Sequence, residues 1–126
     1  MNKIEYTQIF KLKKMLEEAK IPFNYANESW SIDYGTYIKH HIYYPSSAKT
    51  VCSCIQGTHT YGNKKDLLEI MGLLTKSEEK MDEVAGWLTA EEVFKRIKRH
   101  HKRFGKFYKQ LKGETKWKNT NYQFVC

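Results

Sequence analysis

Apolar residues near the N-terminus recur at the spacing of one face of a helix. They follow one another at steps of three, four and three, with charged residues between them: Ile9, Leu12, Leu16 and Ala19. This pattern is typical of an amphipathic helix, which we expect over residues 5–20. Ile21-Pro22 predicts its end, because the residue before a proline is pushed out of the helical region.

The following segment is rich in β-branched and aromatic residues and predicts β-strands. We expect strands at 30–32, 36–44 and 50–55, with a turn at 33–35 and a break after Tyr44, where Pro45 begins a turn-like segment. Together they predict a three-stranded antiparallel meander. Two alternations compete for the inner face of the second strand, so the pattern leaves its orientation open: Ile38, His40, Ile42 and Tyr44 against Tyr37, Lys39, His41 and Tyr43.

The second half of the chain predicts two more principal helices. Asp66 is placed to cap a short helix, which its apolar residues predict to be buried: Leu67, Leu68, Ile70, Met71 and Leu74. Thr89 and Glu92 form a capping box that begins a long helix, and Thr75 and Glu78 have the same spacing. The long helix carries an apolar stripe that can face the core or a partner: Phe94, Ile97, His101, Phe104, Tyr108 and Leu111.

The predicted fold class is therefore α+β: an N-terminal helix, a three-stranded antiparallel β-meander, a short buried helix and a long basic C-terminal helix. At 126 residues the chain is expected to form a single domain, residues 1–126, with a mixed helix and sheet part at 1–93 and a basic helix and tail at 94–126. No apolar run approaches the roughly 18 residues that span a bilayer, and the N-terminus lacks the apolar core of a secretory signal. We expect a cytoplasmic protein without membrane contact.

The positive charge is concentrated in one segment. The net charge is +8, yet residues 94–118 contain eleven Lys and Arg residues against Glu114 alone, and residues 1–93 hold eleven basic and thirteen acidic residues. A segregated basic block is typical of proteins that bind anions. The cations that recur along one side of the long helix are the candidate phosphate-binding residues: Lys95, Arg99, Lys102, Arg103, Lys106 and Lys109.

Aromatic residues accompany this basic segment. Rings offer faces on which bases stack, so Trp87, Phe107 and Tyr108 are the candidate base-stacking residues. The alternative is a solvated helix whose rings belong to the core. That alternative is favoured for Phe104 and Tyr108, which lie on the apolar stripe.

The sequence offers little for metal binding or catalysis. Adjacent histidines point in different directions on a strand or helix, and the group Cys52, Cys54 and His59 lacks paired CxxC spacing. The odd cysteine count predicts reduced thiols in Cys52, Cys54 and Cys126. No phosphate loop or nucleophile elbow occurs, so we expect no metal, no cofactor and no enzyme activity.

Three segments resemble small proteins carried by phages and prophages of Gram-positive bacteria. The resemblance covers about Ile4 to Lys98 and rests on IYYPSSAKTVCSCIQGTHTYG (42–62), DLLEIMGLLT (66–75) and LTAEEVFKRIK (88–98). Within that group the chain is similar to the Thoeris anti-defence sponges, which capture cyclic ADP-ribose-type immune signals without cleaving them. The similarity implies a function for the family as a whole and carries over no individual ligand residues.

We therefore expect a viral anti-defence protein that binds and sequesters a small phosphorylated cyclic nucleotide in the host bacterial cytoplasm. The apolar stripe of the long helix predicts a homo-oligomer. The alternative uses the same basic residues to bind nucleic acid, or to inhibit a host nucleic-acid-binding defence enzyme in the manner of an anti-CRISPR protein. A thiol-dependent hydrolase is a third class, for which no local signature is present.

Overall fold

The computed structural model describes the backbone of residues 6–32 and 35–115, with side chains for 6–31 and 35–105. The helices are α1 (Gln8–Glu18), α2 (Lys76–Met81) and α3 (Ala90–Thr115), with a 3-10 turn at Asn63–Lys65. Five strands form one antiparallel sheet, in this spatial order: β1 (Asn24–Asn27), β4 (Lys39–Pro45), β5 (Thr50–Gly57), β6 (Leu68–Met71) and β7 (Val84–Leu88). A second, two-stranded ladder consists of β2 (Trp30–Ile32) and β3 (Gly35–Tyr37).

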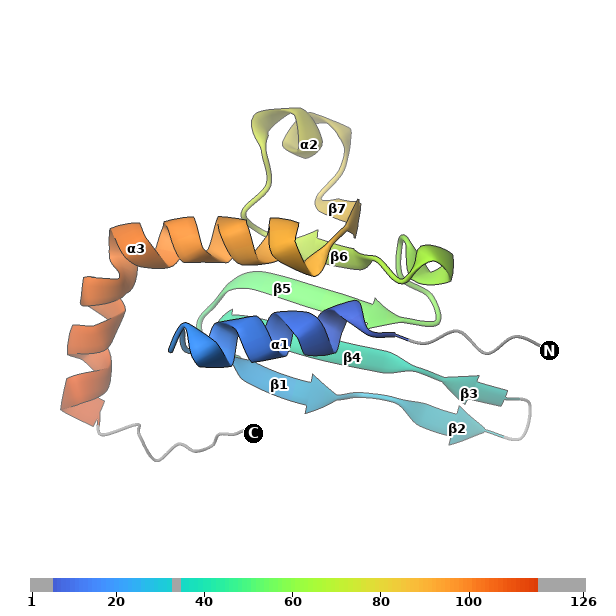
Figure 1. The fold of residues 1–126 in the computed structure, drawn as a ribbon, viewed down its shortest axis with the longest axis horizontal. Helices are drawn as coiled ribbons and strands as arrows, with labels where there is room; N and C mark the ends of the chain where they lie inside the picture. Colours follow the sequence, from blue (N-terminus) through green and yellow to red (C-terminus); the bar gives the residue numbers. More distant parts are fainter. Residues whose placement is uncertain (1–5, 33–34, 116–126) are drawn as a thin grey trace.

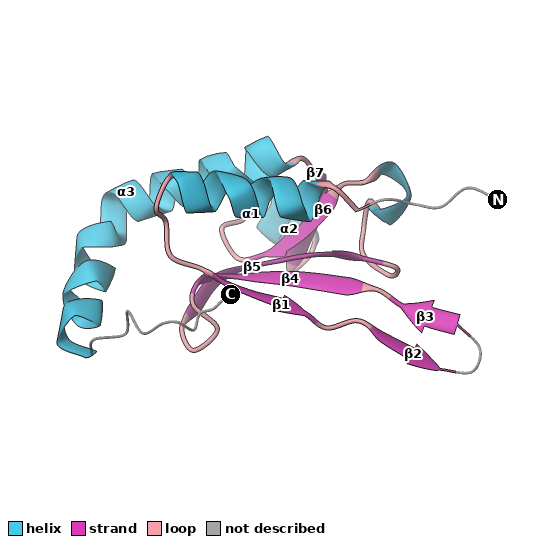
Figure 2. Cartoon of the chain, turned by 60° about the horizontal axis from the view of Figure 1, so that its bottom comes forward, coloured by secondary structure: helices cyan, strands magenta, loops and turns pink. Residues whose placement is uncertain are grey.

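The two longer helices lie on the same face of the five-stranded sheet (Figure 1). α1 packs over β4 and β5, α3 packs over β6, and the two helices contact each other. Figure 2, which views the sheet closer to its edge, shows that none of the described elements covers the opposite face of β4 and β5. We call that side the open face of the sheet.

The core lies between the sheet and these helices. Alternate residues of the central strands point into it, and they meet one stripe of each helix. The largest fully buried apolar side chains are Ile9, Leu12, Leu16, Ile42, Tyr44, Leu68, Ile70, Val93 and Ile97. Because burying one such aliphatic side chain stabilises the fold by about 1.5–3 kcal/mol, this set fixes which side of each strand faces the helices.

β1 pairs with β4 and β2 pairs with β3, and the two ladders keep the same register. Asn24 lies opposite Tyr43 in the first ladder, and Trp30 lies opposite Tyr37 in the second. Between them the amide of Glu28 donates to the carbonyl of Lys39 at 2.8 Å. The second ladder therefore continues the β1–β4 pair along the strand direction, past the end of the main sheet, as Figure 1 shows.

The sequence-based prediction of a three-stranded meander is wrong, because the main sheet has five strands. The short buried helix predicted after Asp66 is also wrong: Leu68–Met71 forms β6, in which Leu68 and Ile70 are buried while Met71 is 53% exposed. Four residues are too few for apolar spacing to separate a strand from a helix. Pairing with β5 and β7 decides the outcome, and it becomes visible only in the tertiary structure.

Asp66 does cap a helix, but a different one from the helix predicted. Its carboxylate accepts the amide of Thr7 at 2.8 Å, the amide of Gln8 at 3.3 Å and the Thr7 hydroxyl, at the start of α1. Gln56, which is fully buried, donates to the same carboxylate at 2.6 Å and accepts the Ile9 amide at 2.9 Å. The N-terminus of α1 is thus held by side chains that lie about fifty residues further along the chain.

Other predicted features are confirmed. The fold is α+β, and the N-terminal helix, the third predicted strand and the long C-terminal helix are present. Thr89 and Glu92 exchange the two hydrogen bonds of a capping box, at 2.8 and 3.1 Å. Thr75 and Glu78 do the same at the start of α2.

Candidate functional site

The described part of α3 presents a row of exposed cations, which we call the basic face: Lys95, Lys98, Arg99, Lys102 and Arg103. Their spacing of three and four residues places them on one side of the helix. Lys98 lies 5.8 Å from the ring centroid of Phe94, and the Arg103 guanidinium lies 5.5 Å from that of Phe104. The other three cations take part in none of the ion pairs and hydrogen bonds found among the described side chains.

Arg96 has a different role from the basic face. Its guanidinium forms two hydrogen bonds to the Glu78 carboxylate, at 2.8 and 2.9 Å, and a third to the Leu73 carbonyl at 3.1 Å. The hydrogen bonds from Arg96 lower the pKa of Glu78 to about 2. Arg96 therefore fastens α2 to α3, and its charge is neutralised within the protein.

Apart from Glu114 near its C-terminal end, the acidic residues of α3 lie in its first turn. Glu91 forms an ion pair with Lys11 at 2.7 Å, and Glu92 belongs to the capping box. From residue 93 to residue 113 the sequence contains no Asp or Glu. Exposed helices usually mix both signs of charge. The absence of acidic residues from this stretch therefore leaves the basic face with an uncompensated positive potential.

The apolar side of α3 differs in part from the stripe predicted. Val93 and Ile97 are fully buried, whereas Phe94 is only partly buried and Phe104 is 44% exposed. Of the predicted stripe, Ile97 is thus in the core, Phe94 packs against it, and Phe104 lies largely outside it. The proposed homodimer seam stays a prediction.

The two histidines of this helix are held by close packing. His100 Nδ1 forms a hydrogen bond with the Tyr44 hydroxyl at 2.8 Å, which ties the helix to the centre of the sheet. A Cβ added to Gly105 would lie 2.9 Å from the His101 ring, so a larger residue would force this ring to shift.

Of the predicted base-stacking residues, the structure describes the side chain of Trp87 alone. Trp87 is 57% exposed and lies in β7 with a left-handed backbone, φ +63°. The side chains of the other predicted residues lie outside the described part of the chain: Lys106, Phe107, Tyr108 and Lys109.

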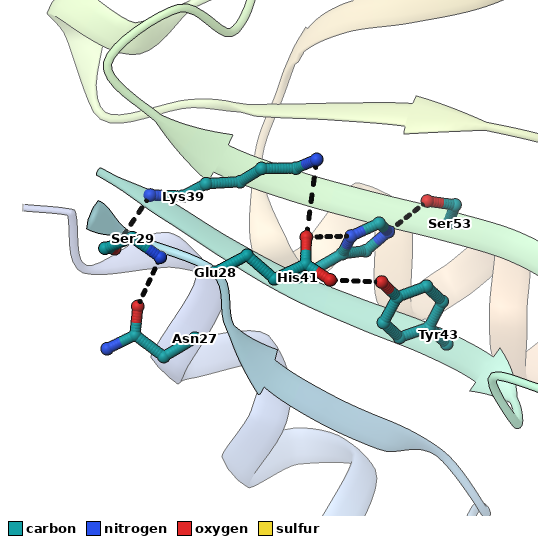
Figure 3. A network of polar contacts seen from close by, with 7 residues as sticks. All are labelled: Asn27, Glu28, Ser29, Lys39, His41, Tyr43 and Ser53. Atoms are coloured by element: carbon teal, nitrogen blue, oxygen red, sulfur yellow. Dashed lines mark hydrogen bonds and ion pairs between the residues drawn. The ribbon is translucent and has the colours of Figure 1, made fainter. Parts of the chain in front are cut away.

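The open face of the sheet carries a polar network that the sequence analysis did not predict (Figure 3). Glu28 Oε1 lies 3.0 Å from His41 Nδ1 and 3.3 Å from Lys39 Nζ, and Glu28 Oε2 accepts the Tyr43 hydroxyl at 2.5 Å. On the other side of the imidazole, His41 Nε2 lies 2.5 Å from Ser53 Oγ. The strand pairing creates this cluster, since Tyr43 lies opposite Ser53 and Glu28 lies beside Lys39.

Burial and hydrogen bonding set the charges of this network. Burial lowers the pKa of His41, and the hydrogen bond and charge of Glu28 oppose that shift only in part. Burial acts to raise the pKa of Glu28, but the hydrogen bonds from Tyr43, His41 and Lys39 outweigh it, so that the pKa is lowered. At neutral pH the network therefore holds a carboxylate and a neutral imidazole.

The connectivity acid–histidine–serine is that of a serine nucleophile with its base. Acyl transfer also requires free N–H donors that stabilise an oxyanion. Ser53 and Cys54 lie inside β5 and are paired with both β4 and β6, so their amides belong to the sheet ladders. We interpret the network as an internally satisfied polar cluster that fixes the end of β1 on the open face.

The strand cysteines do not resemble catalytic or metal-binding thiols. Cys52 and Cys54 are 1% and 0% exposed on the helix-covered side, and burial raises the pKa of Cys52 to about 12. His59 instead stacks on Tyr37. Among the described side chains, 6–31 and 35–105, no group of three or more His, Cys, Asp or Glu is arranged to hold a metal ion.

Comparison with protein-family models, curated proteins and solved structures finds no match for this chain. None of the helices in the described residues is long and apolar enough to cross a membrane.

Proposed function

We propose that this protein binds the phosphate backbone of a nucleic acid through the basic face of α3, without catalysing a reaction. The observation that carries the proposal is the row of exposed cations at 95–103, which no carboxylate of the described chain neutralises. Lys and Arg at such positions neutralise phosphates and release the counterions that surround them. Like charges three or four residues apart destabilise a helix by a few tenths of a kcal/mol per pair, so a purely structural helix gains nothing from them.

The shape of the surface supports an extended anion. Lys95, Arg99 and Lys102 lie on the outside of a helix and span about 10 Å along its axis. Nucleic acids place successive phosphates of one strand about 3.4 Å apart along their axis. Three nucleotides therefore cover the span of these cations, whereas a small ligand on a convex helix stays open to water.

A second candidate is sequestration of a small phosphorylated cyclic nucleotide, which the resemblance to phage anti-defence sponges favours. Arg99 and Arg103 support it, because they lie one turn apart and both are exposed. Two guanidinium groups at this spacing offer planar, bidentate donors to one phosphate group. Either ligand fits an anti-defence role in the host cytoplasm.

A triple variant separates binding from stability. Replacing Lys95, Arg99 and Lys102 by Gln should lower the affinity for a fluorescent oligonucleotide at least about tenfold, or about 1.4 kcal/mol, measured by anisotropy. The magnitude of the slope of log K against log salt should fall by about 2–3, since each of the three phosphate contacts contributes about 0.7–0.9. Thermal stability should stay the same or rise slightly because repulsion is removed.

The matched control removes three exposed lysines elsewhere on the surface, Lys14, Lys49 and Lys80. It changes the net charge by the same amount and should change affinity and salt slope less than the α3 variant. Equal losses in the two variants would refute a specific role for the basic face. Calorimetry with cyclic nucleotides tests the second candidate, which requires tight binding with a small salt slope and no affinity for oligonucleotides.

A further inference from the structure

Three rings form a stack at the end of the sheet that carries β2 and β3. The ring centroids of Trp30 and Tyr37 are 5.1 Å apart with 26° between their planes. Tyr37 and His59 are also 5.1 Å apart, with 24° between their planes. We call these three residues the ring stack.

Backbone contacts hold the ring stack in place. Trp30 and Tyr37 are direct cross-strand partners. The loop that carries His59 is pinned to β4 by the Thr58 amide, which donates to the Ile38 carbonyl at 2.9 Å, and by the Ile38 amide, which donates to the Thr58 hydroxyl at 2.8 Å. A Cβ on Gly57 would lie 1.9 Å from the Ile38 carbonyl oxygen, so only glycine allows this approach.

The ring stack lies on the open face. The continuous register places Trp30 on the same side as Glu28, and Tyr37 on the same side as Lys39 and His41. Tyr37 has a ring on each side, whereas Trp30 ends the stack and is 51% exposed. Stacking on a cross-strand partner stabilises a hairpin, which accounts for the pair of Trp30 and Tyr37 and does not require a third ring or an exposed indole.

We propose that the ring stack binds an unpaired base of single-stranded nucleic acid, which stacks on the exposed side of Trp30. Aromatic rings bind bases of any sequence in this way, because every base has a π face. A duplex keeps its bases stacked on each other and cannot use this site. The proposal rests on nucleic-acid binding by the basic face, and it names the form of nucleic acid that is bound.

The course of α3 allows one strand to reach both surfaces. In Figures 1 and 2 the second half of α3 turns and runs past the end of the sheet where β4 leads into β5, and the ring stack's strands β2 and β3 lie at the opposite end. The sequence continues to place cations on that half, at Lys106, Lys109 and Lys112. Because α3 passes this end of the sheet, a strand bound to the basic face has to continue along the open face to reach Trp30, so a long ligand should bind better than a short one.

The test compares single-stranded and duplex oligonucleotides of about 20 nucleotides, longer than the roughly 4–16 that one small domain covers. Trp30→Ala should weaken binding of the single strand at least about fivefold and leave duplex binding unchanged. The salt slope should not change, because no charge is removed. Trp30→Phe keeps a ring and should retain most of the affinity, and Phe10→Ala is the control for an exposed ring outside the stack.

A second measurement does not depend on the fold of the alanine variant. With Trp87 and Trp117 replaced by Phe, Trp30 is the remaining tryptophan, and its fluorescence should be quenched when oligo-dT is added. Absence of quenching under conditions of full binding, or equal losses for single strand and duplex in Trp30→Ala, would overturn the ring-stack proposal. If only the α3 variant weakens binding, the proposed function stands and this inference fails; if no nucleic acid binds, both fail.

Discussion

Replacing Asp66 tests how the first helix is anchored. The Asp66 carboxylate accepts two amides and a hydroxyl at the start of α1, and Thr7, the N-cap residue, makes no capping hydrogen bond of its own. Asp66 has a left-handed backbone, φ 55°, which glycine and asparagine tolerate and alanine does not. Asp66→Gly therefore removes the acceptors without straining the backbone, and Asp66→Asn removes only the charge.

The structure sets the magnitude of each effect. Losing a helix cap costs about 0.5–2 kcal/mol. Asp66→Gly also leaves the side-chain amide of the buried Gln56 without its acceptor, at about 1–3 kcal/mol. Since Asp66 is only half-buried, water can replace some of the lost hydrogen bonds. We therefore expect the free energy of unfolding of Asp66→Gly to fall by about 2–4 kcal/mol. Asp66→Asn keeps an acceptor oxygen and should cost about 1 kcal/mol.

Urea unfolding followed by circular dichroism measures these differences. Asp82→Asn is the control, because Asp82 is exposed and accepts only the amide of Glu83; it should stay within about 0.5 kcal/mol of the wild type. Hydrogen bonds from Thr7 and Gln56 outweigh burial and lower the pKa of Asp66 below 3.8, so its stabilisation is present above that pH and is lost as the pH falls further. The anchoring role would be refuted by an Asp66→Gly variant as stable as the wild type. It would also be refuted if the difference in free energy of unfolding between the wild type and Asp66→Asn were the same at pH 7 and pH 2.

Three further predictions concern other parts of the fold. Thr89→Ala should destabilise the protein by about 0.5–2 kcal/mol in urea, since it removes the cap of α3, while Thr89→Ser should restore most of the loss. Burial lowers the pKa of His41 below 6.5 with help from the charge of Lys39 and against the effect of Glu28, so the unfolded state takes up the proton first as pH falls. The free energy of unfolding should therefore decrease from pH 7 to pH 5, and less steeply in His41→Gln. In a Cys126→Ser protein, a thiol reagent should leave both remaining thiols unmodified until the protein unfolds, because burial raises their pKa; rapid native reaction would contradict their placement in the core.

The helices were largely predictable because their signals are local. Ile9, Leu12 and Leu16 fall on one side of a helix whatever they pack against, and a capping box needs only residues three positions apart. The missed strands lack such signals. β1 has the polar sequence NYAN, and β7 contains Gly86 and a Trp87 with positive φ, so neither has the alternation of a half-buried strand. Their partners in the sheet make them strands.

The polar network depended on register, which the sequence analysis left open. The pairing of β2 with β3 places Trp30 opposite Tyr37 and Glu28 lies beside Lys39, but the pattern left the inner face of the second predicted strand undecided. Burial of Ile42 and Tyr44 against the helices settles that choice and turns His41 and Tyr43 to the open face. A one-residue slip would exchange the two sets, so the site exists only once the core is packed.

The protein uses its two kinds of charge differently, and this difference links the fold to the proposed function. Carboxylates accept hydrogen bonds that hold elements together: Asp66 anchors α1, Glu78 binds Arg96 between α2 and α3, and Glu28 joins β1 to β4. Lys95, Arg99 and Lys102 of the basic face form no ion pair or hydrogen bond among the described side chains, and neighbouring like charges weaken the helix that carries them. Removing an acid should therefore lower stability, whereas removing these cations should not. A surface that contributes nothing to folding, and that attracts anions over about a Debye length, is best explained by a ligand outside the molecule.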